Sequence, residues 1–132
     1  MQLTFSWPTA FRREVPTCTA DVEETGGFSP LSRILEDDGG VDRATRIDWI
    51  REGIRRVVEA EQSTPNVVSL AWAGEEFAAV ISSSFTKVHY LLEDGHEETI
   101  STASFRLVLE AWLKFLLAGS TTGAVTLSVL RE

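Results

Sequence analysis

The sequence predicts an α+β fold: an antiparallel β-meander sheet of about five or six strands, packed on one side by two longer helices. Apolar residues recur at helical spacing over residues 42 to 61 and again over 102 to 118. Between these stretches, residues 66 to 101 alternate in polarity and contain short turn signals. At 132 residues the chain has the size of one domain. We expect a single domain over residues 1 to 132, with a core at 42 to 132 and an N-terminal segment at 1 to 41 that either packs on this core or extends to a partner.

The N-terminal segment contains one strand signal and one helix signal. Residues 2 to 7 alternate in polarity and predict a first strand that ends at Pro8. Residues 12 to 27 are polar, and they predict a loop with room for one short strand. Ser29 can cap free backbone amides and Pro30 suits the first helical position, so a short helix is expected to begin there.

Asp42 is the expected N-cap of the first long helix. An apolar stripe defines its buried face: Ile47, Ile50, Ile54, Val57 and Val58. At about 100° per residue, Trp49 lies off this stripe and lines up with Gly53 and Arg56. A tryptophan beside a glycine can seat another element closely. Trp49 and Arg56 therefore form the second of two candidate partner-binding surfaces.

The meander is expected to contain four short strands, at residues 66 to 73, 77 to 83, 85 to 92 and 97 to 101. Asp94-Gly95 predicts a two-residue type I′ turn between the last two strands. Such a turn sets Glu93 opposite His96, and it leaves His89 opposite Ile100. The two histidines then do not face each other.

The second long helix is expected to begin at a cap formed by Ser101 or Thr102 and to end at Gly119. Its buried stripe contains large apolar side chains at helical spacing: Phe105, Val108, Leu109, Trp112 and Leu116. Residues 124 to 132 alternate again, and they predict a further strand associated with the meander.

Charge and composition narrow the class of partner. The formal net charge is −8, which repels phosphates and anionic lipid, so we expect neither nucleic acid nor a membrane as partner. Cys18 is the one cysteine and needs no oxidising compartment. The chain shows neither a signal-peptide pattern at its start nor an uninterrupted apolar span. We therefore expect a cytoplasmic protein.

The sequence offers few groups for catalysis. His89 and His96 are the two histidines, and no short His-x-x-x-His or Cys-x-x-Cys spacing occurs. The serines at 82 to 84 lack the glycines of a nucleophile elbow, and the glycines match no nucleotide-binding motif. We therefore predict no catalytic, cofactor-binding or metal-binding residues.

Acidic residues are expected to collect at one end of the meander. In a meander, the first and third turns lie at the same end of the sheet. This places six carboxylates and one histidine together: Glu75, Glu76, Glu93, Asp94, His96, Glu97 and Glu98. Two interpretations stay open. The edge is either a solvated one that discourages aggregation or a docking surface for a basic protein.

The order of elements over residues 42 to 118 resembles a family of small acidic proteins. An amphipathic helix, a short meander and a capped helix reading SFRLVLEAWLKFL, together with Trp49 and Trp72, look like the immunity proteins that neutralise polymorphic and contact-dependent bacterial toxins. The resemblance implies non-catalytic, cytosolic binding to a cognate protein toxin, often over a basic nucleic-acid-cleaving site. It carries over no individual residues.

Two other classes remain as alternatives. The helix-sheet-helix order is also similar to type III-like secretion chaperones, which bind an effector and are usually dimeric. Those chaperones typically begin with their amphipathic helix, whereas about 40 residues precede it here. A small enzyme of unknown reaction is the third class.

Overall fold

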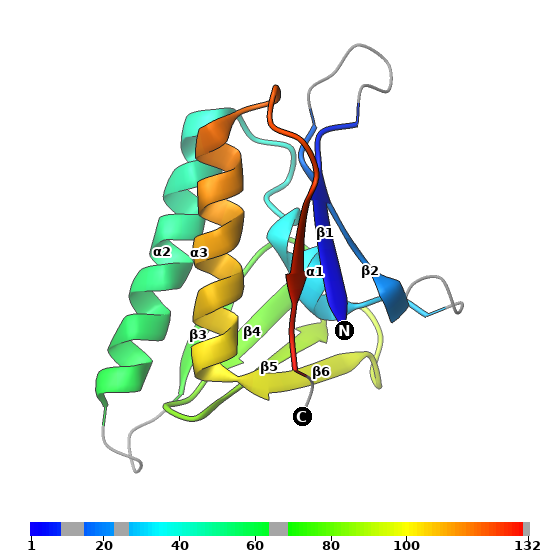
Figure 1. The fold of residues 1–132 in the computed structure, drawn as a ribbon. Coiled ribbons are helices and arrows are strands. Elements are labelled where there is room, and N and C mark those ends of the chain that lie inside the picture. Colours follow the sequence, from blue (N-terminus) through cyan, green and yellow to red (C-terminus); the bar gives the residue numbers. More distant parts are fainter. Residues whose placement is uncertain (9–14, 23–26, 64–68, 131–132) are drawn as a thin grey trace.

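The computed structural model describes residues 1–8, 15–22, 27–63 and 69–130, and it confirms the α+β class. Its elements are arranged as in Figure 1. The strands are β1 (Gln2–Ser6), β2 (Thr17–Ala20), β3 (Leu70–Ala73), β4 (Phe77–Ile81), β5 (Phe85–Tyr90), β6 (Glu97–Ser101) and β7 (Val125–Ser128). The helices are α1 (Pro30–Leu35), α2 (Arg43–Gln62) and α3 (Thr102–Ala118).

The strands form two antiparallel sheets, so the prediction of one sheet is wrong. Strands β3, β4, β5 and β6 form the predicted meander in sequence order. The other sheet has the order β2-β1-β7, with Leu3 of β1 opposite Leu127 of β7. The C-terminal strand therefore pairs with the N-terminal strand rather than with the meander. Residues 66 to 68 of the first predicted meander strand lie outside the described residues.

The two long helices run side by side in opposite directions and cover the inner face of the meander (Figure 1). Helix α2 contacts β3 and β4, and α3 contacts β5 and β6. The short helix α1 contacts β2 as well as β4 and β5, so it joins the two sheets. The prediction that both long helices pack on one side of the meander is confirmed.

Local signals in the sequence determine where the long helices begin and end. Asp42 Oδ1 accepts a hydrogen bond of 2.8 Å from Thr45 N, and this bond holds the pKa of Asp42 below its ordinary value. Ser101 is the cap of α3, since its Oγ accepts from Ser104 N at 3.1 Å. Thr102 is buried instead and donates to Ser82 O at 2.7 Å. Gly119 ends α3 with a φ of 87°.

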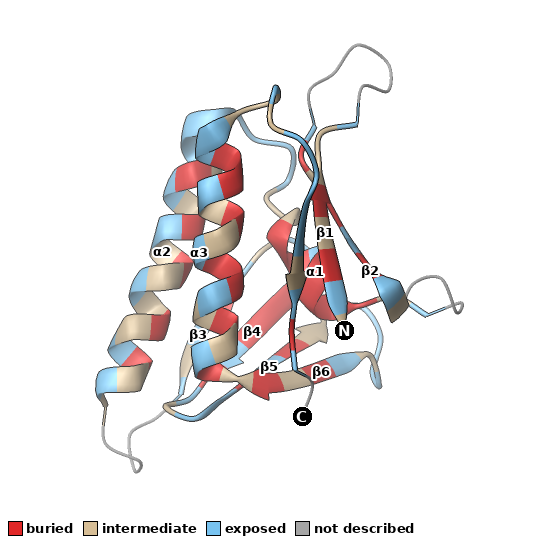
Figure 2. Ribbon diagram, viewed as in Figure 1, coloured by how far each residue is buried: buried red, intermediate tan, exposed pale blue. Residues whose placement is uncertain are grey.

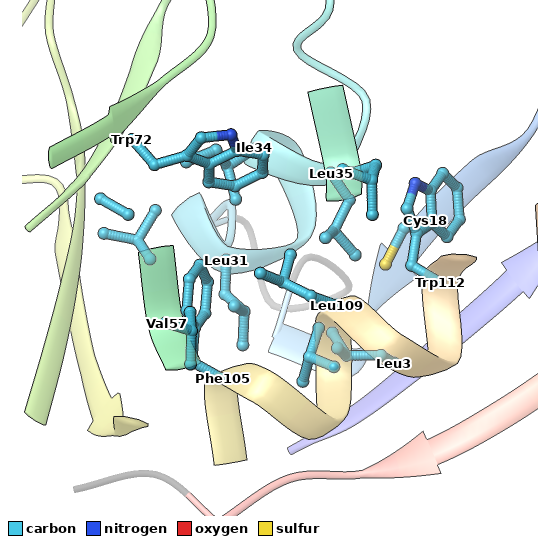
Figure 3. Packing of buried hydrophobic residues seen from close by; sticks show 14 of the residues in the cluster. Leu3, Cys18, Leu31, Ile34, Leu35, Val57, Trp72, Phe105, Leu109 and Trp112 are labelled. Carbon is cyan, nitrogen blue, oxygen red and sulfur yellow. The ribbon is translucent and has the colours of Figure 1, made fainter. Parts of the chain in front are cut away.

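One cluster of buried apolar side chains draws on both sheets and all three helices. The buried faces of α2 and α3 are red in Figure 2. Figure 3 shows Leu3 from β1, Leu31 from α1 and Leu109 from α3 gathered in this cluster. Phe5 of β1 meets Trp112 of α3 edge to face, with ring centroids 5.0 Å apart. Each such buried side chain stabilises the fold by roughly 1.5 to 3 kcal/mol.

Candidate functional site

The two turns that carry the predicted acidic surface lie against each other. Strand pairing sets Phe77, the first residue of β4, opposite Tyr90, the last residue of β5. Beyond this pair, Leu91 N donates a hydrogen bond of 2.8 Å to Glu76 O. The β3–β4 turn is thereby bonded directly to the β5–β6 loop. The predicted convergence of these two segments is confirmed.

Five of the six predicted carboxylates are exposed at this end of the meander, and we call them the acidic rim: Glu75, Glu76, Glu93, Asp94 and Glu97. His96 is half-buried beside them. Basic side chains lie close to some of these carboxylates. Lys87 Nζ is 3.8 Å from Glu97 Oε1, and His96 Nε2 is 3.5 Å from Glu93 Oε1.

Glu98 does not belong to the rim, so its predicted exposure is wrong. Only 6% of this residue is exposed. Its Oε1 accepts hydrogen bonds from Leu31 N at 3.1 Å and from Ser29 Oγ, at the first turn of α1. Successive residues of a strand point to opposite faces. Glu97 therefore faces solvent, while Glu98 ties β6 to α1.

The predicted two-residue turn at Asp94-Gly95 is also wrong. Tyr90 N donates to His96 O at 2.9 Å, so residues 91 to 95 form a longer loop, in which Gly95 has a φ of 91°. His89 lies opposite Glu97 rather than opposite Ile100. The two histidines still do not meet. His96 stacks on Phe28 with centroids 4.7 Å apart, whereas His89 belongs to the opposite face of the sheet.

Asp37 holds the first turn of the rim in place. Its Oδ2 accepts hydrogen bonds of 2.8 Å from Glu76 N and from Phe77 N. Its backbone oxygen accepts from Glu75 N at 3.2 Å. A side chain at Gly74 would not fit, because a Cβ there would lie 2.2 Å from Asp37 O. The rim carboxylates are thus carried on a backbone whose position is fixed by several bonds.

A cavity of about 330 Å³ opens beside the rim. Its walls combine three aromatic rings with charged side chains: Phe28, Phe77, Tyr90, Glu76, Glu93 and Arg33. The ring of Phe28 is inclined by 79° to those of both Phe77 and Tyr90, at centroid distances of 6.1 and 5.7 Å. The rings of Phe77 and Tyr90 are 5.0 Å apart and inclined by 35°. The three rings therefore contact one another on one side of the cavity.

The three aromatic residues of this cavity are not among the site residues predicted from the sequence. They come from different parts of the chain: Phe28 precedes α1, Phe77 begins β4 and Tyr90 ends β5. Each has a local signal, since Phe28 adjoins the Ser29 cap while Phe77 and Tyr90 flank the two acidic turns. The signals do not reveal that the rings meet.

Two leucines of the β5–β6 loop are exposed among the carboxylates. Leu91 is 49% exposed and Leu92 is 67% exposed. A solvated loop that serves solubility does not require apolar side chains at its tip, although single exposed leucines are common on proteins. An apolar centre ringed by charged groups is typical of a protein-binding surface.

The second predicted surface, Trp49 and Arg56 on α2, packs against the edge strand β3. Trp49 Nε1 donates to Ala73 O at 3.1 Å, and Arg56 Nη1 donates to Ala71 O. Trp72 of β3 stacks on Trp49 with centroids 4.3 Å apart. A Cβ on Gly53 would lie 2.8 Å from this indole, so the expected close seating beside the glycine is confirmed.

Arg56 also belongs to a small ionic cluster on α2. Its Nε donates to Glu52 Oε1 at 3.0 Å, and Arg55 donates to the same carboxylate. Both hydrogen bonds lower the pKa of Glu52, and the bond from Arg55 has the larger effect. Glu52 in turn raises the pKa of Arg55 by accepting its hydrogen bond. The polar groups of Trp49 and Arg56 are therefore engaged within the chain.

Among the described residues, no group of three or more His, Cys, Asp or Glu side chains is arranged to hold a metal ion. No helix in the described ranges combines the length and apolarity needed to cross a membrane.

Comparison of the chain with protein-family models, with curated proteins and with solved structures finds no match.

Proposed function

We propose that the protein is a non-catalytic inhibitor of a basic bacterial toxin, an immunity protein that binds its partner through the acidic rim. One observation carries the proposal. Five exposed carboxylates are held together by the joined β3–β4 turn and β5–β6 loop, with Leu91 and Leu92 exposed among them. The surface therefore offers both charge and apolar area to a protein partner.

The physical case for a basic partner rests on like-charge repulsion. Carboxylates gathered on one surface repel one another in the free protein, and lysines or arginines of a partner relieve this repulsion on binding. The net charge of −8 extends the attraction beyond the contact surface. Electrostatic steering of this kind raises association rates to about 10⁸ M⁻¹s⁻¹ at low salt. A toxin that acts on nucleic acid presents a basic surface of the matching sign.

The proposal is tested by reversing rim charges that do not line the cavity. The test requires a candidate partner, a basic toxin domain encoded by a neighbouring gene, and association rates are measured against salt concentration. We expect the double variant Asp94→Lys and Glu97→Lys to associate about tenfold more slowly at low salt, with a flatter salt dependence.

The matched control reverses two exposed acids on the long helices, Glu59→Lys and Glu110→Lys. Both double variants have the same net charge, −8 + 4 = −4. The rim is not the binding surface if the rim variant leaves the association rate and its salt dependence unchanged. The same conclusion follows if the control variant changes both equally. A stable homodimer holding a secreted effector would instead identify a secretion chaperone.

A further inference from the structure

The cavity beside the rim has the composition of a receptor for a cation. Its walls provide the rings of Phe28, Phe77 and Tyr90 and the carboxylates of Glu76 and Glu93. The face of an aromatic ring carries partial negative charge and attracts an ammonium or guanidinium group. Two carboxylates at the same cavity add attraction of the same sign.

The size and surroundings of the cavity indicate the source of that cation. About 330 Å³ lies at the lower end of the range for ligand pockets, so it suits one side chain rather than a large cofactor. The rim carboxylates and the exposed Leu91 and Leu92 extend the contact area well beyond the cavity. A cation that belongs to a protein can use this whole surface, whereas a free amine cannot.

We infer that the cavity is an anchor site that receives one lysine or arginine side chain of the protein partner. The stem of that side chain packs against the rings of Phe28, Phe77 and Tyr90, and its charged end lies between Glu76 and Glu93. The inference rests on the proposed function, since it names the kind of residue by which the partner is held at the acidic rim.

The rings are held in position before any partner binds. His96 stacks on Phe28 at 4.7 Å, and Phe77 is buried beneath the first turn of the rim. Asp37 fixes the backbone amides of Glu76 and Phe77. A preformed site of this kind loses little conformational entropy when it is occupied.

Arg33 also lines the cavity and opposes a bound cation. The two carboxylates outnumber this guanidinium, so the cavity still favours positive charge. The positive charge of Arg33 therefore provides a test of whether the cavity binds a cation or an anion. Replacing Arg33 by glutamine strengthens the binding of a cation, whereas the same change weakens the binding of an anion.

The experiment uses the full chain and a small probe, n-butylguanidinium chloride, at constant ionic strength. Binding is followed by two-dimensional ¹H–¹⁵N NMR, with the neutral analogue n-butylurea as comparison. We expect shifts at Phe28, Glu76, Phe77, Tyr90 and Glu93. Butylguanidinium should bind about tenfold more tightly than butylurea. Equal binding of the two probes would overturn the inference.

Variants of the wall residues separate the roles of the rings and the charges. Phe28→Leu and Tyr90→Leu keep an apolar side chain but remove a ring, and each should weaken butylguanidinium binding about tenfold. Glu93→Gln is a surface change that leaves the fold intact, and it should weaken binding about threefold. Arg33→Gln should strengthen it about threefold.

The matched control is Phe85→Leu, because Phe85 is 50% exposed and belongs to the outer face of the meander. It should leave butylguanidinium binding unchanged. An unchanged affinity in Glu93→Gln, or a weaker affinity in Arg33→Gln, would contradict a cation site.

The two proposals fail separately. If the cavity does not select butylguanidinium but the Asp94 and Glu97 reversals still slow toxin association, the anchor site is wrong and the rim remains the binding surface. If the cavity selects the cation but those reversals have no effect, the proposed function is wrong. In that case the cavity is a cation site that does not serve toxin binding.

Discussion

Two neighbouring glutamates of β6 perform different tasks at the scale of single residues. Glu97 faces solvent near Lys87, and Glu98 is buried against the first turn of α1. A buried carboxylate is tolerated only when hydrogen bonds replace its hydration. Ser29 and Leu31 supply such bonds. Glu98 therefore stabilises the contact between the meander and α1.

We predict that Glu98→Ala lowers the free energy of unfolding by about 2 to 3 kcal/mol. The change leaves the Ser29 hydroxyl and the Leu31 amide buried without their acceptor. Urea denaturation measures the loss. Glu97→Ala is the control, and it should change the free energy by less than about 0.5 kcal/mol. Similar losses in both variants would show that the buried Glu98 stabilises the fold no more than the exposed Glu97 does.

The burial of Glu98 could have been predicted from the sequence, although a charged side chain is usually expected at the surface. Glu98 shares a strand face with Ile100, which is a buried apolar residue. Alternation along the strand therefore points Glu98 inward. Counting acids around the turn, without asking which face each one occupies, placed it on the surface.

At the scale of elements, helix α2 shields the open edge of β3. An edge strand presents unpaired backbone groups to other chains. Trp49 and Arg56 donate to the carbonyls of Ala73 and Ala71, which alternate along that edge. Gly53 lets Trp72 close against the helix. Side chains of α2 thus bond the edge at which a further strand could otherwise pair.

We predict that Arg56→Ala increases self-association and lowers the free energy of unfolding by about 1 kcal/mol, because the Ala71 carbonyl loses its donor. Light scattering and urea denaturation measure the two effects. Arg55→Ala is the matched control, since Arg55 bonds Glu52 alone among the described hydrogen bonds. Equal self-association in both variants would show that Arg56 does not protect the β3 edge from pairing with other chains.

Helices were predictable in this chain because their signals are local. Asp42, Ser101 and Gly119 lie at the ends of α2 and α3 as expected. Strand pairing was less predictable, since the alternation in β7 shows a strand but not its neighbour. The β5–β6 register was missed for a similar reason. The observed pairing of Tyr90 with His96 goes with contacts to Phe28 and Ser29, which lie far away in sequence.

At the scale of the whole molecule, one core joins the two sheets. Phe5 of β1 contacts both Trp112 and Phe115 of α3, at centroid distances of 5.0 and 5.7 Å. Helix α3 in turn packs on β5 and β6 of the meander. The three-stranded sheet and the meander are therefore expected to unfold together.

We predict that Phe5→Ala lowers the free energy of unfolding by about 3 to 5 kcal/mol, through the cavity it leaves in the core. Far-ultraviolet circular dichroism and tryptophan fluorescence should still report one urea transition with the same midpoint. Phe85→Ala on the exposed outer face is the control and should change little. Separate midpoints for the two signals would show that the sheets unfold independently.

The site was predictable at this scale to the extent that it follows from topology. A meander brings its first and third turns together whatever their composition, and this placed the rim. The cavity beside it was not predictable, because its rings come from the segment before α1, from β4 and from β5. The contact among these three rings depends on where α1 packs, and no periodic pattern in the sequence indicates that position.

The stacked indoles of Trp49 and Trp72 provide the molecule with an internal optical reporter. At a centroid distance of 4.3 Å and an inclination of 27°, their electronic transitions couple. The coupling disappears when β3 separates from α2, so it distinguishes that event from unfolding near Trp112. Movement of the edge strand can therefore be followed by circular dichroism in the unlabelled protein, including while a partner binds.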